Sequence, residues 1–333
     1  MVKGKILTGM VIFLLLIFFP VSCVRAQTRK LNVIYTATSP YMAVLIIAKE
    51  VGFFKKNNLD ISLIFTSGGP LGVQAMIGGD VAMAMTNGAA AIASNLAGSD
   101  VVIIASLLNT FPYSLVSLPE IKRVEQLVGG KIAIDRFGGS TDLGVQMALA
   151  KVGLNAAKDM ILLQIGVQTA RFTALQSRSV HATIINPPFT LTARKMGFNT
   201  LIDMAQLNIP FQLTALLATK TYIKGHRDVV TSVIKSLVEA IHFYKTEKEA
   251  SIRILRKYLM TEDREALEET YNEIALKVVP EKPYPTLAGL QTILDELAKK
   301  NPKAKVAQPE DFVDSSFVKK LDEEKFIDRL YRR

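Results

Sequence analysis

Residues 31–54 of the chain, LNVIYTATSPYMAVLIIAKEVGFF, indicate the fold class. The apolar residues 31–35 predict a short strand, and Ser39 and Pro40 are typical of a helix N-cap and of the first helical position. The helix predicted over 41–51 ends at Gly52, a residue that is common just after helices. This segment is therefore a strand, a polar turn and a helix, which is the repeating unit of α/β proteins.

The same order of elements continues along the chain. It restarts near Leu127, so we predict two similar α/β halves, each with a largely parallel sheet. The predicted strands are 31–35, 61–66, 81–85 and 101–106 in the first half and 131–135, 161–165 and 182–185 in the second. The intervening helices include 168–176 and one that begins at 186–188 and ends at Gly197.

The last third of the chain has a different pattern. Two apolar segments, 113–118 and 213–219, are placed to be strands that pass between the halves. From Arg227 on, apolar residues recur every three or four positions, which predicts a helix. These residues are Val229, Val233, Leu237, Ile241 and Tyr244. Further helices are predicted over 250–259, 264–278, 286–300 and 317–331.

Residues 1–26 have the pattern of an export signal. Lys3 and Lys5 precede an apolar run over 10–19, and a stretch of small residues ends at Ala26. The run is too short to span a bilayer, which needs about 20 residues. We expect cleavage after Ala26, with an uncleaved membrane anchor and a lipoprotein cut before Cys23 as the alternatives.

The composition excludes several classes of protein. A length of 333 residues with 49% hydrophobic and 21% charged residues is that of a globular protein of about two domains. The single cysteine excludes a disulfide framework and a cysteine-rich metal site. The net charge of +10 is spread along the chain without an aromatic-interleaved basic stripe, so we expect no nucleic-acid partner.

No common catalytic motif is present in the sequence. His181, His226 and His242 share no metal-ligand spacing, and there is no nucleophile-elbow, Walker or dinucleotide-binding motif. We therefore predict a protein that is not an enzyme, with no catalytic residue, no cofactor and no metal.

Four polar turns that follow strands are the candidate ligand-binding segments. Ligands of open α/β sheets bind outside the carboxyl ends of the strands, where free N–H groups at helix N-termini hold anionic or polar groups. Helix capping alone would also explain these residues, but the turns occur in both halves, which favours a binding cleft. The candidate ligand-binding residues are Ser39, Tyr41, Asn87, Gly88, Gly139, Ser140, Thr141 and Asn186.

Three further side chains could complete this cleft. Phe137 and Phe189 are candidates for apolar walls beside Tyr41. Arg136 is the local candidate for pairing an anionic group, although a solvated loop arginine explains it equally well.

Six stretches of the sequence carry a resemblance to a known family, namely 39–41, 48–54, 79–82, 127–133, 149–154 and 186–188. In these stretches the chain resembles the extracytoplasmic substrate-binding proteins of ABC importers, in the nitrate, sulfonate and taurine group that also includes thiamine-precursor-synthase-like members. In one respect it departs from the group, because Arg178 and His181 stand where the second lobe often has Gly and Asp.

This resemblance implies a type II periplasmic-binding fold. Such a fold has two α/β lobes joined by two crossover strands, with the C-terminal helices packed on lobe 1. The expected division is 27–116 with 215–333 as lobe 1, and 117–214 as lobe 2.

The resemblance also implies a function. The two lobes would close by a hinge around a small polar or anionic solute, such as a sulfonate, nitrate, taurine-like or heterocyclic compound. A periplasmic monomer would then deliver this solute to a membrane permease. The alternatives are an enzyme on the same fold, like the thiamine-precursor synthases, and a lipid-anchored sensory binding protein.

Overall fold

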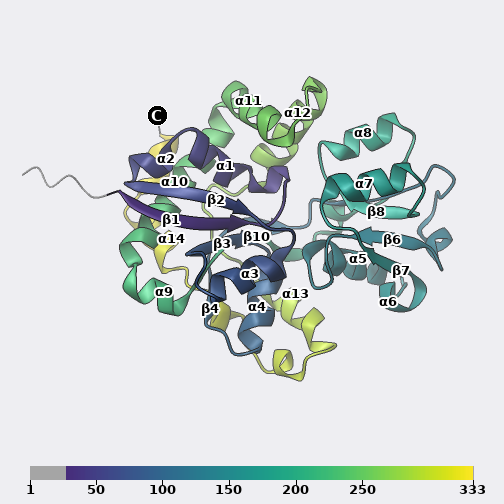
Figure 1. The fold of residues 1–333 in the computed structure, drawn as a ribbon, viewed down its shortest axis with the longest axis horizontal. Helices are drawn as coiled ribbons and strands as arrows, with labels where there is room; N and C mark the ends of the chain where they lie inside the picture. The colour runs from purple at the N-terminus through teal and green to yellow at the C-terminus, as the bar shows by residue number, and fades with distance from the viewer. Residues whose placement is uncertain (1–27, 333) are drawn as a thin grey trace, which may run out of the picture.

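The structure is a computed structural model that describes residues 28–332. The predicted export signal and Cys23 lie outside the described residues. Two five-stranded sheets form the centres of two lobes that lie side by side (Figure 1). The prediction of two α/β halves is therefore confirmed.

In the first lobe the strand order is β2-β1-β3-β10-β4. Strand β1 pairs parallel with β2 and β3, whereas β10 pairs antiparallel with β3 and β4. The strands are β1 (Arg29–Tyr35), β2 (Leu59–Phe65), β3 (Met83–Thr86), β4 (Val101–Thr110) and β10 (Pro210–Thr219).

In the second lobe the strand order is β7-β6-β8-β5-β9. Strand β6 pairs parallel with β7 and β8, whereas β5 pairs antiparallel with β8 and β9. The fourth strand of each sheet is thus antiparallel, and it is the strand that arrives from the other lobe. The strands are β5 (Ser114–Ser117), β6 (Lys131–Ile134), β7 (Ile161–Gln164), β8 (Ala182–Ile185) and β9 (Asn199–Asp203).

Helices lie on both sides of each sheet (Figure 1). The α-helices are α1 (Ala43–Glu50), α2 (Phe53–Lys56), α3 (Gly69–Ile77), α4 (Gly88–Leu96), α5 (Ser140–Lys151), α6 (Ala156–Asp159), α7 (Gln168–Gln176), α8 (Phe189–Lys195), α9 (Lys220–Gly225), α10 (Arg227–Thr246), α11 (Lys248–Leu259), α12 (Arg264–Thr270), α13 (Leu287–Ala298), α14 (Ser316–Glu323) and α15 (Phe326–Tyr331). The 3-10 segments are η1 (Pro40–Met42), η2 (Val124–Leu127), η3 (Met204–Leu207), η5 (Pro302–Lys305) and η6 (Pro309–Phe312), and η4 (Tyr271–Val278) is a π-helix. None of the described helices is long and apolar enough to cross a bilayer.

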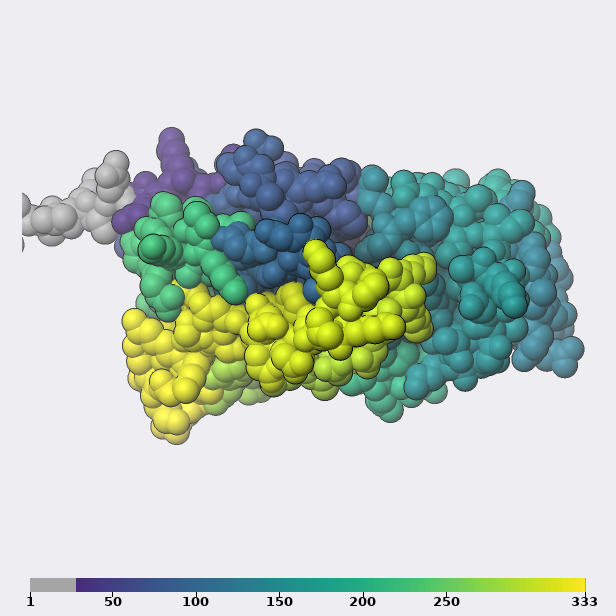
Figure 2. All heavy atoms as spheres, turned by 90° about the horizontal axis from the view of Figure 1, so that it is seen from below, coloured from purple at the N-terminus to yellow at the C-terminus, as the bar shows by residue number. Residues whose placement is uncertain are grey.

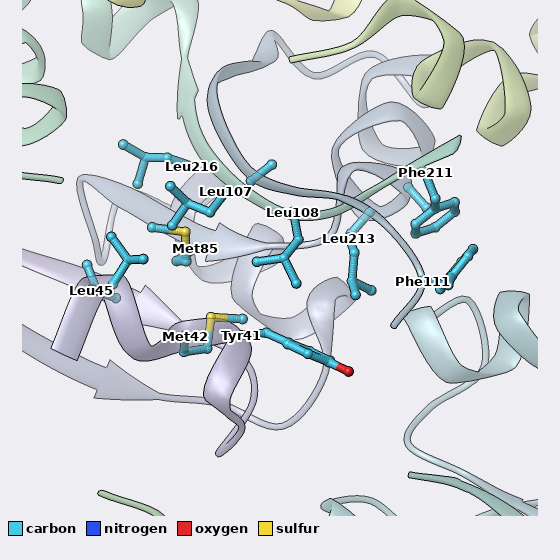
Figure 3. Close-up of a cluster of buried hydrophobic side chains, with 14 of the residues drawn as sticks. Tyr41, Met42, Leu45, Met85, Leu107, Leu108, Phe111, Phe211, Leu213 and Leu216 are labelled. Carbon is cyan, nitrogen blue, oxygen red and sulfur yellow. The ribbon is translucent and has the colours of Figure 1, made fainter. Parts of the chain in front are cut away.

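The chain passes between the lobes twice, at residues 111–113 and 204–209. These crossings come before the expected limits after residues 116 and 214, because the two apolar segments are not themselves the crossings. Segment 113–118 contains β5 of the second sheet, and 213–219 belongs to β10 of the first. Phe111 stacks on Phe211 with ring centroids 4.0 Å apart, which packs the two crossing regions together (Figure 3).

The C-terminal helices belong to the first lobe. Helix α10 packs on α1 and α2, and its predicted apolar stripe is buried. C-terminal residues cover one face of this lobe and reach the second lobe (Figure 2). Two predicted helices are not single regular α-helices. The helix predicted over 264–278 is α-helical in α12 and then becomes the π-helix η4. The helix predicted over 317–331 is split in two because Lys325 adopts a left-handed conformation with φ +56°.

The core of the first lobe extends to its boundary with the second. Met42, Leu45, Met85 and Leu216 fill the space between helix α1 and the sheet (Figure 3). Tyr41 lies at the edge of this cluster, and its hydroxyl points away from the aliphatic side chains (Figure 3). The packed core therefore fixes the position of a polar group at the junction of the lobes.

Candidate functional site

The carboxyl ends of parallel strands from both lobes meet at one cavity. Residues that follow β1, β2 and β3 line it from the first lobe, and residues that follow β6, β7 and β8 line it from the second. The cavity has a volume of about 50 Å³, which is room for a few water molecules or a small solute. It is lined by 36–39, 41–42, 67–69, 87, 113, 135, 140–141, 166–168, 171, 186 and 213–214.

The structure brings six of the eight candidate residues to this cavity. They are Ser39, Tyr41, Asn87, Ser140, Thr141 and Asn186. Gly88 and Gly139 do not line it. A Cβ on Gly88 would lie 2.7 Å from the Cβ of Gln212, and one on Gly139 would lie 2.6 Å from Oδ1 of Asp135. These two glycines therefore permit close packing next to the site.

The polar turns also cap helices, as their residue types predicted. The Ser39 side chain accepts a hydrogen bond from the Tyr41 N–H at 3.3 Å, and Asn87 Oδ1 accepts one from the Ala90 N–H at 3.0 Å. Both side chains keep further hydrogen-bonding capacity toward the cavity, because a hydroxyl and an amide each have more than one donor or acceptor position. Capping and solute binding are thus compatible at these residues.

The lobes are in contact across the cavity. Asn186 Nδ2 donates to Ser39 Oγ at 3.4 Å, and Arg136 Nε donates to the Ser67 carbonyl at 3.4 Å. Each bond joins a residue of one lobe to a residue of the other. Residues from both lobes therefore surround the same space.

Two tyrosines join this space to the first crossing. Tyr41 donates from its hydroxyl to the Pro112 carbonyl, and the Tyr113 hydroxyl is 3.2 Å from Ser140 Oγ. Their rings meet edge to face with centroids 5.4 Å apart. Burial raises the pKa of Tyr113 to about 12, so its hydroxyl stays protonated at neutral pH.

A buried arginine lines the cavity, and the sequence analysis did not identify it. The side chain of Arg171, in α7, is 4% exposed and donates to the backbone carbonyls of Gly166 and Ile184. Its Nε has no hydrogen-bond partner among the described residues. Burial lowers the pKa of Arg171 and nearby Asp135 raises it, but a guanidinium stays charged at any physiological pH.

The cavity also contains a carboxylate. Asp135 Oδ1 accepts hydrogen bonds from Thr141 Oγ1 at 2.6 Å and from the Arg136 N–H at 2.7 Å. No described residue donates to its other oxygen, and the residue forms no ion pair with Arg171 within the described part of the chain. Both charged residues that line the cavity therefore belong to the second lobe, and each keeps capacity for a solute.

Three other candidates lie elsewhere. Arg136 uses its Nε on the Ser67 carbonyl and does not line the cavity. Phe137 is 55% exposed outside the cavity, and Phe189 packs edge-on against Phe172 with ring centroids 5.3 Å apart. The apolar part of the lining comes instead from Ala37, Tyr41, Met42 and Leu213 of the first lobe and Val167 of the second.

A family model described as "NMT1/THI5 like" matches residues 39–250. The chain belongs to this NMT1/THI5-like family. The resemblance found in the sequence is therefore confirmed, and the matched residues contain the whole second lobe and the cavity-lining residues of the first lobe from Ser39 on.

The individual proteins that this chain resembles have low sequence identity to it. A putative binding protein, YtlA of Bacillus subtilis strain 168, is 22% identical over 231 residues, which are 68% of this chain and 69% of YtlA. Among solved structures, the alkanesulfonate-binding protein SsuA from Xanthomonas axonopodis pv. citri has a TM-score of 0.71 at 18% identity, over 87% of this chain and 99% of SsuA. The periplasmic nitrate-binding protein NrtA from Synechocystis PCC 6803 has a TM-score of 0.73 at 14% identity, over 90% and 89%. These similarities show that the fold is that of periplasmic binding proteins.

The structure explains how this NMT1/THI5-like chain accommodates its two unusual residues in the second lobe. Arg178 adopts a left-handed conformation with φ +60°, the backbone geometry that glycine adopts most readily. His181 Nδ1 accepts a hydrogen bond from the Lys131 N–H at 2.9 Å, as a carboxylate would. The turn before β8 thus combines a left-handed residue with a side-chain acceptor.

No group of His, Cys, Asp and Glu within residues 28–332 could hold a metal ion.

Proposed function

We propose that this protein captures a small polar or anionic solute in the cavity between its lobes and delivers it to the permease of an ABC importer. The observation that carries the proposal is the convergence of polar turns from both lobes on one cavity. Opening the lobes exposes the lining of this space, and closure surrounds a bound solute with residues of both lobes. The hinge is the pair of crossings at residues 111–113 and 204–209.

An anionic group of the solute would be held from the second lobe. Arg171 is the only positively charged residue among the described residues that line the cavity. The N-termini of α5 and α7 supply N–H groups at the same place, because Ser140, Thr141 and Gln168 are their first residues and line the cavity. The positive charge of Arg171 and the N–H groups of the two helix N-termini would therefore both attract an anionic group of the solute.

A hydrogen-bond donor on the solute would be held by Asp135. Asp135 lines the cavity, and no described residue donates a hydrogen bond to its Oδ2. A carboxylate is an acceptor only, so an amine, amide or hydroxyl of the solute would satisfy it. We infer that the preferred solute has an anionic group and a donor group a few bonds apart, as in an aminosulfonate, an amino acid or a substituted heterocycle.

The side chains that line the cavity support binding of the solute without a chemical reaction. The lining includes Ser140, but the partner of its hydroxyl is Tyr113 and not a histidine. No described lining residue is a cysteine, histidine or lysine, so the side chains that most often act as activated nucleophile or base are not at this place.

The names of similar proteins and the predicted export signal support a location outside the cytoplasm. NrtA is named as a periplasmic protein, and another structural neighbour, from Staphylococcus aureus, is named as the ligand-binding component of an ABC-type import system. We propose that residues 1–26 export this chain as well, and that it acts outside the cytoplasm as a monomer.

A thermal-shift screen tests the proposed function. The probes are nitrate, taurine, propane-1-sulfonate, glycine and an aminopyrimidine. A solute that binds only the folded chain raises the Tm, by an amount that corresponds to about 2.7 kcal/mol at a concentration of 100 times the Kd. We expect at least one probe to raise the Tm, with taurine above propane-1-sulfonate, because these two differ in the group that would face Asp135.

Two cavity variants and one control complete the screen. Ser140→Ala and Asn87→Ala should lose most of the shift, whereas Ser177→Ala, an exposed serine in the second lobe outside the cavity, should keep it. A shift that is equal in all three variants would place the binding site elsewhere. Absence of any shift in the unmodified chain would contradict the proposed function.

A further inference from the structure

Three ion pairs join the lobes at a place outside the cavity. Arg194, in α8 of the second lobe, lies 2.7 Å from Glu269 of the first lobe. Lys195, the next residue, lies 2.6 Å from Glu265 and 3.3 Å from Asp263. Helices α8 and α12 lie next to each other where the two lobes meet (Figure 1). None of these five residues lines the cavity.

The carboxylates of this group have their ion-pair partners only in the second lobe. Asp263, Glu265 and Glu269 form no ion pair within the first lobe, as far as the structure describes it. The neighbouring charges of the first lobe pair among themselves instead: Arg264 with Glu249 and Glu268, and Arg256 with Glu262. Separating the lobes would therefore leave three carboxylates without partners on one short helical segment, which is unfavourable because like charges repel.

We propose that Arg194 and Lys195 with Asp263, Glu265 and Glu269 form an interlobe latch, which sets the ratio of closed to open molecules and makes that ratio depend on ionic strength. The inference rests on the proposed function in one respect only, namely that the lobes open and close. It adds a second set of closing contacts that does not touch the solute.

The latch works because its ion pairs break in the same motion. A single exposed ion pair contributes little to stability, about 0–1 kcal/mol, since water and salt screen it. Three pairs that all separate when α8 moves away from α12 act together on one equilibrium. The hydrogen bond from Lys195 to Glu265 also raises the pKa of Lys195, so the lysine stays charged throughout the physiological range.

High salt should weaken the ion pairs of the latch more than the other contacts between the lobes. The Debye length falls from about 10 Å at 0.1 M salt to about 3 Å at 1 M, so exposed pairs lose much of their attraction. Two other interlobe hydrogen bonds, Asn186 with Ser39 and Arg136 with the Ser67 carbonyl, have an uncharged partner and depend less on salt. The latch therefore predicts a salt-dependent population of open molecules before any solute is added.

Distances between two spin labels measure that population. A chain of residues 27–333 contains no cysteine, so labels can be attached at Ile77→Cys in the first lobe and Val128→Cys in the second. Both residues are exposed and lie outside the cavity and the latch. We expect one main distance at about 20 mM salt, and a second distance that gains population at about 1 M salt.

Charge reversal separates the latch from a general salt effect. Arg194→Glu with Lys195→Glu should raise the ratio of open to closed molecules roughly threefold to tenfold at low salt. Adding Glu265→Lys and Glu269→Arg to that variant should restore the original distances, because the pairs re-form with exchanged signs. The control is Lys257→Glu, which breaks the pair of Lys257 with Glu50 inside the first lobe, and it should have no effect on the distances.

The latch is overturned if the distances respond neither to salt nor to charge reversal, or if the Lys257→Glu control changes them as much. A variant that fails to regain the closed distance when the charges are exchanged would also contradict it. These results are distinct from failure of the proposed function, because they are obtained without solute. A chain can bind a solute in the thermal-shift screen and lack a latch, and a latch can exist in a chain that binds none of the probes.

Discussion

Asn186 of the second lobe donates a hydrogen bond to Ser39 of the first lobe across 3.4 Å, next to the cavity that both residues line. The same two side chains can therefore hold the lobes together and bind a solute. Asn186 follows β8, and Ser39 caps the helical turn that follows β1, so two strand ends from different sheets meet at this bond.

The first prediction concerns this bond. Asn186→Ala should weaken binding of the stabilising probe about tenfold, because one net hydrogen bond contributes about 1 kcal/mol or somewhat more. Isothermal titration calorimetry measures the affinity. Gln176→Ala, an exposed residue of the same lobe, is the control and should bind like the unmodified chain. Equal affinities for Asn186→Ala and the control would show that the amide does not contribute.

The second prediction concerns the buried charge. Arg171→Met keeps most of the side-chain length and removes the guanidinium, so the affinity for an anionic probe should fall roughly 30-fold or more, as expected for a hydrogen bond to a charged group worth about 2 kcal/mol. Arg171→Lys keeps the charge and should recover part of the affinity, since an ammonium lacks the fixed geometry of the guanidinium. The prediction is wrong if the methionine variant binds the anion as tightly as the lysine variant.

The third prediction concerns packing beside the site. Gly88→Ala places a methyl group 2.7 Å from the Cβ of Gln212 and 3.1 Å from Cδ1 of Ile103, so it should lower stability by about 1–3 kcal/mol. Gly225→Ala, at the end of α9, meets no atom within 4 Å and should be neutral or stabilising by up to about 1 kcal/mol. Urea denaturation of the two variants gives the comparison. Equal midpoints would show that Gly88 is not constrained by its neighbours.

The fourth prediction concerns alkaline pH. Burial raises the pKa of Tyr113 to about 12, whereas a tyrosine of the unfolded chain has a pKa of about 10. The unfolded chain therefore loses this proton first, and the stability that Tyr113 contributes is complete below pH 10 and is lost as the pH rises toward 12. The loss amounts to about 2–3 kcal/mol for this group.

Urea midpoints of the unmodified chain and of Tyr113→Phe, measured between pH 9 and pH 11.5, test this sign. The phenylalanine variant should lose less stability over this interval, because it removes one of the buried groups that resist ionisation. Burial also raises the pKa values of Tyr41 and Tyr258, so the stability of the Tyr113→Phe variant should still fall with pH, but less steeply. Parallel curves for the two proteins would contradict the prediction.

Local signals in the sequence predicted much of the fold. Helix α7 and strand β8 have the predicted limits, 168–176 and 182–185, and a polar residue, Ser177 or Asn186, directly follows each of them. Ser39 caps the helical turn as its residue type indicated. Strand β9 was not predicted, since the five residues 199–203 are short, partly polar and without alternation.

The candidate site could be predicted only where it lies in turns. Arg171 lies in the middle of a helix, and a single arginine there is usually solvated. A signal did exist, because Gln168, Arg171, Phe172 and Leu175 share one buried face of α7. Gln168 and Arg171 are polar residues on the otherwise apolar face of α7, and this pattern is the signal for a polar cavity beside the helix. The packing role of Gly88 depends on Gln212, which is distant in sequence, so no local pattern indicates it.

A crystal structure of the chain with its stabilising probe tests the central claim most directly. The account predicts the probe between Ser39 and Asn87 of one lobe and Ser140 and Asn186 of the other, with its anionic group within hydrogen-bond distance of Arg171. A probe bound on the surface of a single lobe, with the space between the lobes empty, would contradict it.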